Sequence, residues 1–150
     1  MSERLKITEV FASIQGEADA SGWPSVFVRL TGCPLRCEYC DTAYAFFGGE
    51  WMEIEEIVAK VKGFGLNHVC VTGGEPLAQA RVHTLLTQLC DLNYSVSVET
   101  SGAISTASVD PRVHVVLDIK TPTSGDRKST RLTPVTLIYF VCRLLLVKKK

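Results

Sequence analysis

Three cysteines lie close together in the segment Cys33-Pro-Leu-Arg-Cys37-Glu-Tyr-Cys40. Their spacing, C-x3-C-x2-C, places three thiolates in one loop, where they can converge on a single soft metal centre. A [4Fe–4S] cluster bound in this way leaves one iron open to a small bidentate molecule. A structural zinc ion would instead need a fourth protein ligand, whereas Cys70, Cys90 and Cys142 stand alone in the sequence. The pattern favours an iron–sulfur cluster, with zinc or unrelated thiols as the alternatives.

Further polar and glycine-rich motifs follow predicted strands. Gly73-Gly-Glu-Pro76 comes directly after the short apolar run 68–72, and Thr100-Ser-Gly102 comes directly after the run 94–99. The bare backbone of Gly73 and Gly74 can approach a ligand closely, although two glycines alone are more typical of a turn. Because parallel strands end at one edge of their sheet, these motifs are expected to lie together with the cysteines.

The elements that position these motifs alternate between strands and helices. Residues 7–14, 25–31, 68–72, 94–99 and 113–119 read as strands, and residues 53–64 and 82–92 have the apolar periodicity of helices. Such alternation with short connections is typical of parallel β/α units. We therefore predict an α/β fold with a parallel sheet.

The chain changes character near residue 125, so we predict a core over residues 1–125 and a separate tail over 126–150. Residues 1–126 contain nine Lys and Arg and all sixteen Asp and Glu, whereas residues 127–150 contain seven Lys and Arg and no acid. An acidic core does not favour a nucleic-acid surface. The apolar stretch 132–147 is shorter than the roughly 20 residues of a membrane helix. The absence of an apolar leader and the clustered cysteines favour a reducing, cytoplasmic location.

Six motifs in one order resemble the radical S-adenosylmethionine (SAM) superfamily and, more narrowly, the 7-carboxy-7-deazaguanine synthase family. The motifs are Phe11-Ala-Ser-Ile-Gln-Gly-Glu17, Phe27-Val-Arg-Leu-Thr-Gly-Cys33, Cys40-Asp-Thr42, Val71-Thr-Gly-Gly-Glu-Pro76, Glu99-Thr-Ser-Gly102 and Asp118-Ile-Lys-Thr-Pro122. The resemblance covers roughly residues 5–125. It implies a partial, abbreviated (β/α)6-type barrel of parallel strands that is incomplete at its C-terminal end.

The same resemblance implies a function. The family converts 6-carboxy-5,6,7,8-tetrahydropterin to 7-carboxy-7-deazaguanine with loss of ammonia, in queuosine and 7-deazapurine biosynthesis. It uses a [4Fe–4S] cluster, SAM and Mg²⁺. A homodimer and a flavodoxin- or ferredoxin-type electron donor are implied as partners, and neither nucleic acid nor a membrane is expected.

Residue roles are carried over on the matching motifs. Cys33, Cys37 and Cys40 would bind the cluster and Thr42 the Mg²⁺ ion. The residues expected to contact SAM are Tyr39, Asp41, Gly73, Gly74, Glu99, Ser101 and Lys120. The residues expected to contact the pterin are Ile14, Gln15, Gly16, Glu17, Arg29 and Thr72. Taken alone, Arg29 fits a structural ion pair equally well.

Two alternatives to this function stay open. A glycyl-radical-enzyme activase also uses C-x3-C-x2-C, although Gln15-Gly-Glu17 and Cys40-Asp-Thr42 argue against it. A non-catalytic iron–sulfur or zinc module is the other, because the resemblance stops near residue 125 while the family continues with further β/α elements. The tail that follows is expected to be unrelated sequence from a truncated or frame-disrupted reading frame.

Overall fold

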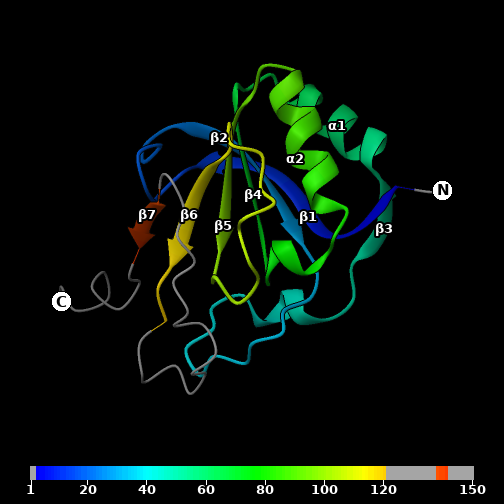
Figure 1. Cartoon of the computed structure of the whole chain (residues 1–150). Coiled ribbons are helices and arrows are strands. Elements are labelled where there is room, and N and C mark those ends of the chain that lie inside the picture. Colours follow the sequence, from blue (N-terminus) through cyan, green and yellow to red (C-terminus); the bar gives the residue numbers. More distant parts are fainter. Residues whose placement is uncertain (1–2, 121–137, 142–150) are drawn as a thin grey trace.

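In a computed structural model, residues 3–120 and 138–141 are described, and they form one seven-stranded sheet with helices on one side (Figure 1). The strand order is β3-β1-β2-β4-β5-β6-β7. The strands are β1 (Arg4–Ile14), β2 (Pro24–Leu30), β3 (Glu50–Glu53), β4 (His68–Gly73), β5 (Ser95–Thr100), β6 (His114–Asp118) and β7 (Ile138–Val141). The helices are α1 (Ile54–Gly63) and α2 (Val82–Asp91), with the short 3-10 turns η1 (Ala43–Phe46) and η2 (Pro76–Ala78).

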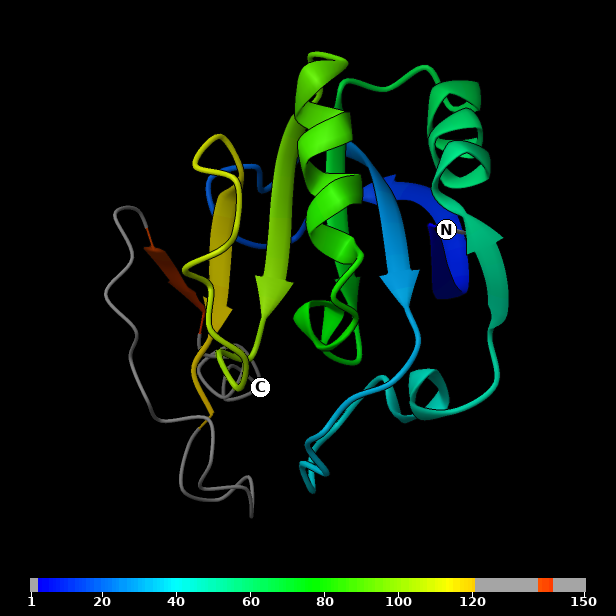
Figure 2. The ribbon, with the colours of Figure 1, turned by 45° about the vertical axis from the view of Figure 1, so that its right-hand side comes forward.

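The centre of the sheet is parallel. Strand β2 pairs with β4, β4 with β5, β5 with β6, and β6 with β7, all in the same direction. The strands β2, β5 and β6 therefore point toward the same end of the molecule, where the cysteine loop also lies (Figure 2). This arrangement confirms the predicted α/β class and the predicted meeting of the motifs at one edge.

The N-terminal side of the sheet differs from the expected run of parallel units. Strand β1 pairs antiparallel with both β2 and β3. Residues 15–23 are too few for the crossover that a parallel pair needs, so the chain turns back on itself instead. The sequence analysis did not predict β3, which forms because Glu50–Glu53 align with the N-terminal half of β1.

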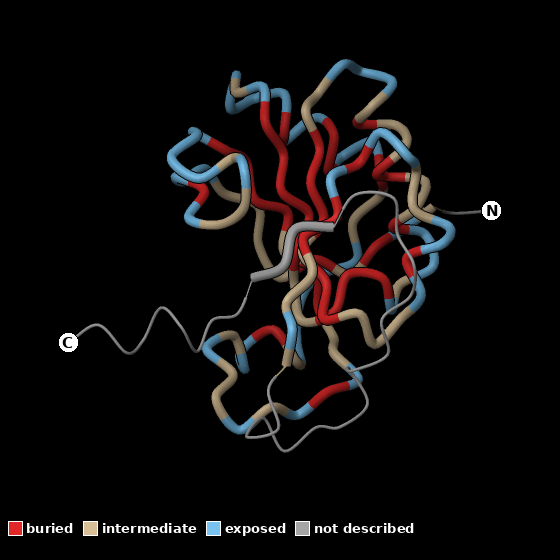
Figure 3. The backbone as a smooth tube through the Cα atoms, turned by 60° about the vertical axis from the view of Figure 1, so that its left-hand side comes forward, coloured by how far each residue is buried: buried red, intermediate tan, exposed pale blue. Residues whose placement is uncertain are grey.

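One face of the sheet packs against the two helices and forms the core. Alternate positions of β2, β4 and β5 supply buried valines to it, and Leu85, Leu86 and Leu89 of α2 are fully buried against them. The predicted apolar face of α1 is confirmed, since Ile54 and Val61 are fully buried. Figure 3 shows these buried segments at the centre of the molecule, with exposed turns around them.

The remaining positions of the same strands face the opposite side and carry the polar groups. They pair across the strands as Ser25 with His68, Arg29 with Thr72, and Cys70 with Ser97. We call this side the polar face. Because side chains alternate along a strand, one set of residues serves the core and the other is available for chemistry.

Part of the predicted tail is ordered as a strand. Residues 138–141 form β7 and align Ile138 with Val115 and Val141 with Asp118 of β6. The predicted boundary at residues 125 and 126 and the rest of the tail lie outside the described residues. Among the described residues, no helix is long and apolar enough to cross a membrane.

Candidate active site

The cysteine loop leaves the carboxyl end of β2 and is held beside the end of β4. Cys33, Cys37 and Cys40 form no disulfides, and each is partly buried. The Cys40 amide donates to the Cys37 carbonyl at 3.1 Å, which turns the loop back on itself. Burial raises the pKa of the Cys33 thiol, and the nearby Glu75 carboxylate adds to this effect.

Gly73, the last residue of β4, is required by close packing on the end of β2, and Gly74 after it by close packing on the cysteine loop. A Cβ at Gly74 would lie 2.4 Å from the Gly32 carbonyl oxygen and 2.7 Å from Cys33 Cβ. A Cβ at Gly73 would lie 2.5 Å from the Leu30 carbonyl oxygen. Backbone bonds from Gly74 to Leu30 and from Glu75 to Gly32 join the two segments. The glycines therefore fix the loop that carries the thiols, in addition to any ligand contact.

Glu75 is a fully buried carboxylate that ties the end of β4 to the end of β5. One oxygen accepts from Thr100 Oγ1 at 2.8 Å and from the Leu77 amide at 3.1 Å. The other accepts from the Ser101 hydroxyl at 2.6 Å and the Ser101 amide at 2.9 Å. In the sequence, Glu75 stands out only as part of the motif Gly73-Gly-Glu-Pro76. The sequence signal that could have found it is an acid two residues after an apolar strand.

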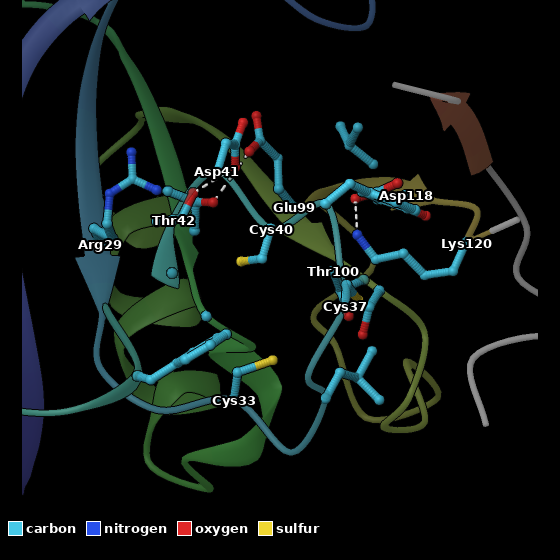
Figure 4. A pocket seen from close by; sticks show the side chains of 18 of the residues that line it. Arg29, Cys33, Cys37, Cys40, Asp41, Thr42, Glu99, Thr100, Asp118 and Lys120 are labelled. Atoms are coloured by element: carbon cyan, nitrogen blue, oxygen red, sulfur yellow. Dashed lines mark hydrogen bonds and ion pairs between the residues drawn. The ribbon is translucent and has the colours of Figure 1, made fainter. Parts of the chain in front are cut away.

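A cleft opens on the polar face at the carboxyl ends of the strands, and Figure 4 shows the three cysteines in it. Most of the predicted site residues line this cleft: Cys33, Cys37, Cys40, Thr42, Tyr39, Asp41, Gly73, Gly74, Glu99, Ser101, Lys120, Glu17, Arg29 and Thr72. Ile14, Gln15 and Gly16 are outside its lining. The sequence analysis did not select Leu35, Phe46, Thr100, Val116 or Asp118, which also line it.

Arg29 lies beside the cleft in an ion pair. Its Nε is 2.7 Å from the Glu9 carboxylate, which also accepts from the Tyr44 hydroxyl at 2.7 Å. The guanidinium lies over the rings of Phe11 and Tyr44, with its carbon 5.8 and 5.9 Å from their centroids. The structural ion pair is therefore present, and this fixed guanidinium borders the cleft, where a carboxylate could approach it.

Thr42 and Asp41 place hard oxygens in the lining of the cleft (Figure 4). The Thr42 hydroxyl donates to Asp41 Oδ1 at 2.7 Å, so its oxygen lone pairs remain directed elsewhere. Hydroxyl and carboxylate oxygens are the kind of ligand that Mg²⁺ prefers. The arrangement is compatible with the Mg²⁺ role predicted for Thr42.

Lys120 reaches the opposite wall of the cleft, where it pairs with Asp118. Burial alone would lower the pKa of Lys120, but the hydrogen bond and charge of Asp118 raise it. The ammonium also lies 5.8 Å from the centroid of the Tyr39 ring. A lysine held in this way is cationic and can balance an anionic group bound in the cleft.

The residues of the loop fit an iron–sulfur cluster. Three thiols without disulfide partners border one cleft, and thiolates are the ligands of such clusters. Across residues 3–120 and 138–141, no three His, Cys, Asp or Glu side chains are grouped for a single metal ion. A four-iron cluster is wider than one ion, so its three ligands stand further apart. Cys33, Cys37 and Cys40 would hold it.

Comparison with known proteins agrees with this site. Residues 27–120 match the radical SAM superfamily, and the chain belongs to that superfamily. Membership implies a [4Fe–4S] cluster and SAM as cofactors.

Within the superfamily, the chain is similar to 7-carboxy-7-deazaguanine synthases. It is 51% identical over 121 residues to that of Chlorobaculum tepidum, covering 81% of this chain and 55% of the relative. It is 52% identical over 105 residues to that of Pyrobaculum aerophilum, covering 67% of this chain and 47% of the relative. The crystal structure of QueE from Escherichia coli matches with a TM-score of 0.69 and 28% identity, over 77% of this chain and 60% of that chain. The chain thus spans about half the length of the curated relatives it matches.

Proposed function

We propose that this chain carries the radical SAM core of a 7-carboxy-7-deazaguanine synthase, a carbon–nitrogen lyase of queuosine biosynthesis. Its substrate would be 6-carboxy-5,6,7,8-tetrahydropterin, which it would convert to 7-carboxy-7-deazaguanine with loss of ammonia. The observation that carries the proposal is a single cleft that joins three cysteines to Thr42, Glu17 and Arg29. The identity of 51% to a relative of this name supports it.

In this function, SAM would lie between the cysteine loop and the carboxyl ends of the strands. When bound, the cluster supplies an electron that cleaves SAM. The protein's part is to hold SAM and to exclude water from it. Tyr39 offers a ring for the adenine, Ser101 a hydroxyl at the ribose, and Lys120 a cation that can balance the carboxylate. Asp41, Glu99 and the backbone at Gly73 and Gly74 complete the proposed SAM contacts.

The pterin would occupy the part of the cleft formed by β1, β2 and the segment between them. The carboxylate of Glu17 can accept two hydrogen bonds from the amino-pyrimidine edge of a pterin. Arg29 and a Mg²⁺ ion on Thr42 would orient the substrate carboxylate. Ile14, Gln15, Gly16 and Thr72 complete the proposed substrate region.

Anaerobic reconstitution tests the function. We expect four irons and four sulfides per chain, and deoxyadenosine production with SAM that depends on the carboxypterin and is raised by Mg²⁺. A chain that binds no cluster would contradict both the synthase and the glycyl-radical-enzyme activase. A cluster without pterin-dependent turnover would favour the activase or a non-catalytic module. The variant Cys37→Ser is the control, since it removes one of the three cluster ligands.

The proposed setting follows from the same function. A flavodoxin- or ferredoxin-type protein would supply the electron, the chain would act as a homodimer, and the reaction would take place in the cytoplasm. Analytical ultracentrifugation of the reconstituted protein measures the oligomeric state directly.

A further inference from the structure

The side chain of Gln15 is buried and fully engaged inside the protein. Only 3% of the residue is exposed. Its Oε1 accepts from the amides of Gly16 at 2.8 Å and Glu17 at 3.1 Å. Because two N–H groups donate to this atom, it must be the amide oxygen, and the other terminal atom is the donor Nε2. That Nε2 donates to Glu99 at 3.1 Å.

The backbone of Gln15 also closes the base of the segment between β1 and β2. Its amide donates to the Trp23 carbonyl at 2.9 Å, and its carbonyl accepts from the Gly22 amide at 2.7 Å. Residues 15–23 therefore form a loop whose two ends are fastened together at Gln15. Within the described part of the chain, the Gln15 side chain is hydrogen-bonded to the sheet at Glu99 of β5 and at Cys70.

Glu99 accepts this hydrogen bond from Gln15 and has a second partner. Its other oxygen accepts from the Thr72 hydroxyl at 3.0 Å. One carboxylate on β5 thus connects the loop that carries Glu17 with the end of β4. Glu17, Thr72 and Glu99 all line the cleft, whereas Gln15 does not. Gln15 therefore lies outside the lining of this cleft, and its side-chain amide is hydrogen-bonded to protein atoms.

We infer that Gln15 is a positioning residue, whose amide, bonded to Glu99, sets the loop 15–17 so that Glu17 faces the substrate. This inference rests on the proposed function for the identity of the substrate, and on the hydrogen bonds alone for the link. In this inference Glu17 recognises the amino-pyrimidine edge, and Gln15 holds Glu17 in place relative to β5.

A hydrogen-bond swap tests the inference. In Gln15→Glu, a carboxylate would face Glu99 at the place of a 3.1 Å hydrogen bond, so the link breaks. In the double variant Gln15→Glu/Glu99→Gln, the new amide donates to the new carboxylate, Thr72 still has an oxygen to donate to, and the net charge of the wild type is restored. A contact role for Gln15 would leave the double variant as impaired as the single one.

We expect Gln15→Glu to raise the KM for the carboxypterin about tenfold, and the double variant to recover most of that loss, as coupled neighbours do. The dissociation constant for SAM in Gln15→Glu should stay within about twofold of wild type. The control Gln88→Glu adds the same charge on α2, outside the cleft lining, and should change neither constant. Because Glu99 is also a proposed SAM contact, the KM values are compared at saturating SAM, and absence of recovery in the double variant under that condition overturns the inference.

Amide hydrogen exchange measures the link without any substrate. The amides of Gly16 and Glu17 should exchange faster in Gln15→Glu than in wild type and return toward the wild-type rate in the double variant. Unchanged exchange overturns the link. If exchange behaves as expected but the wild-type protein neither binds nor turns over the carboxypterin, the proposed function fails and the link stands. The iron content and circular dichroism of each variant show whether it has folded.

Discussion

At the scale of single residues, Gly74 shows how a ligand-binding motif can also be a packing requirement. The added Cβ of Gly74→Ala would meet backbone atoms of Gly32 and the Cβ of Cys33, which cannot move without shifting the cysteine loop. We expect a loss of about 1–3 kcal/mol in the free energy of unfolding, the usual range for overpacking. Iron bound per chain should fall as well. Urea denaturation and an iron assay measure the two effects.

The matched control for this substitution is Gly63→Ala at the end of α1. A Cβ there meets no atom within 4 Å, and alanine favours a helix over glycine by about 0.5–1 kcal/mol. It should therefore preserve or raise stability and leave the iron content unchanged. Equal stability of Gly74→Ala and wild type would contradict the packing argument.

His68 makes stability depend on pH. Burial, and secondarily the nearby His114, lowers the pKa of His68 below its usual value of about 6.5. The neutral ring is held between the hydroxyls of Ser25 at 2.7 Å and Ser97 at 3.2 Å. Below about pH 6.5 the unfolded chain binds a proton that the folded chain resists, so stability falls as pH falls from 7 toward 5.

Urea denaturation across this pH range checks the sign. In His68→Gln the dependence on pH should be weaker than in wild type, because the titrating group is gone. An unchanged dependence in His68→Gln would show that another group is responsible.

At the scale of elements, Glu75 joins β4, η2 and β5 through one buried carboxylate. Each oxygen accepts two donors. In Glu75→Gln, one of the two positions becomes an amide NH2 that faces N–H and O–H donors. We expect a loss of about 1–3 kcal/mol, the cost of leaving buried polar groups unpaired. Glu55→Gln on the exposed side of α1 should stay within about 0.5 kcal/mol of wild type in the same urea titration.

How far the sequence could predict these elements depends on how local their causes are. The helix α1 was predictable because its capping box at Glu53 and its buried Ile54 lie within one stretch of chain. The four-residue β3 was not, because its pairing with β1 is decided by residues far away in sequence. The roles of Glu75 and Glu99 depend on neighbours in other strands. The sequence could place Glu75 and Glu99 at the ends of strands, but it could not show which groups they are hydrogen-bonded to.

At the scale of the whole molecule, the two faces of the sheet divide stability from chemistry. The helix-covered face holds fully buried valines and leucines, and the polar face lines the cleft. Resemblance to a family indicated which residues belong to the cleft. The structure adds that Arg29, Thr72 and Glu99 of the cleft come from alternate positions of the same strands that build the core, so these strands cannot shift register without disturbing both faces.

This division predicts opposite outcomes for Leu86→Ala and Thr42→Ala. Leu86 is fully buried in α2, and its truncation should cost about 2–5 kcal/mol of stability while leaving the affinity for the carboxypterin and its response to Mg²⁺ unchanged below the unfolding transition.

The described hydrogen bond of Thr42 is an exposed one to Asp41, so Thr42→Ala should cost less than about 1 kcal/mol. It should, however, remove the gain in pterin affinity that the proposed Mg²⁺ ion would give, and Thr42→Ser should restore that gain because it keeps the hydroxyl. Calorimetric titration with the carboxypterin at increasing Mg²⁺ separates the two variants. A Thr42→Ala protein that still responds to Mg²⁺ would place the ion on other ligands.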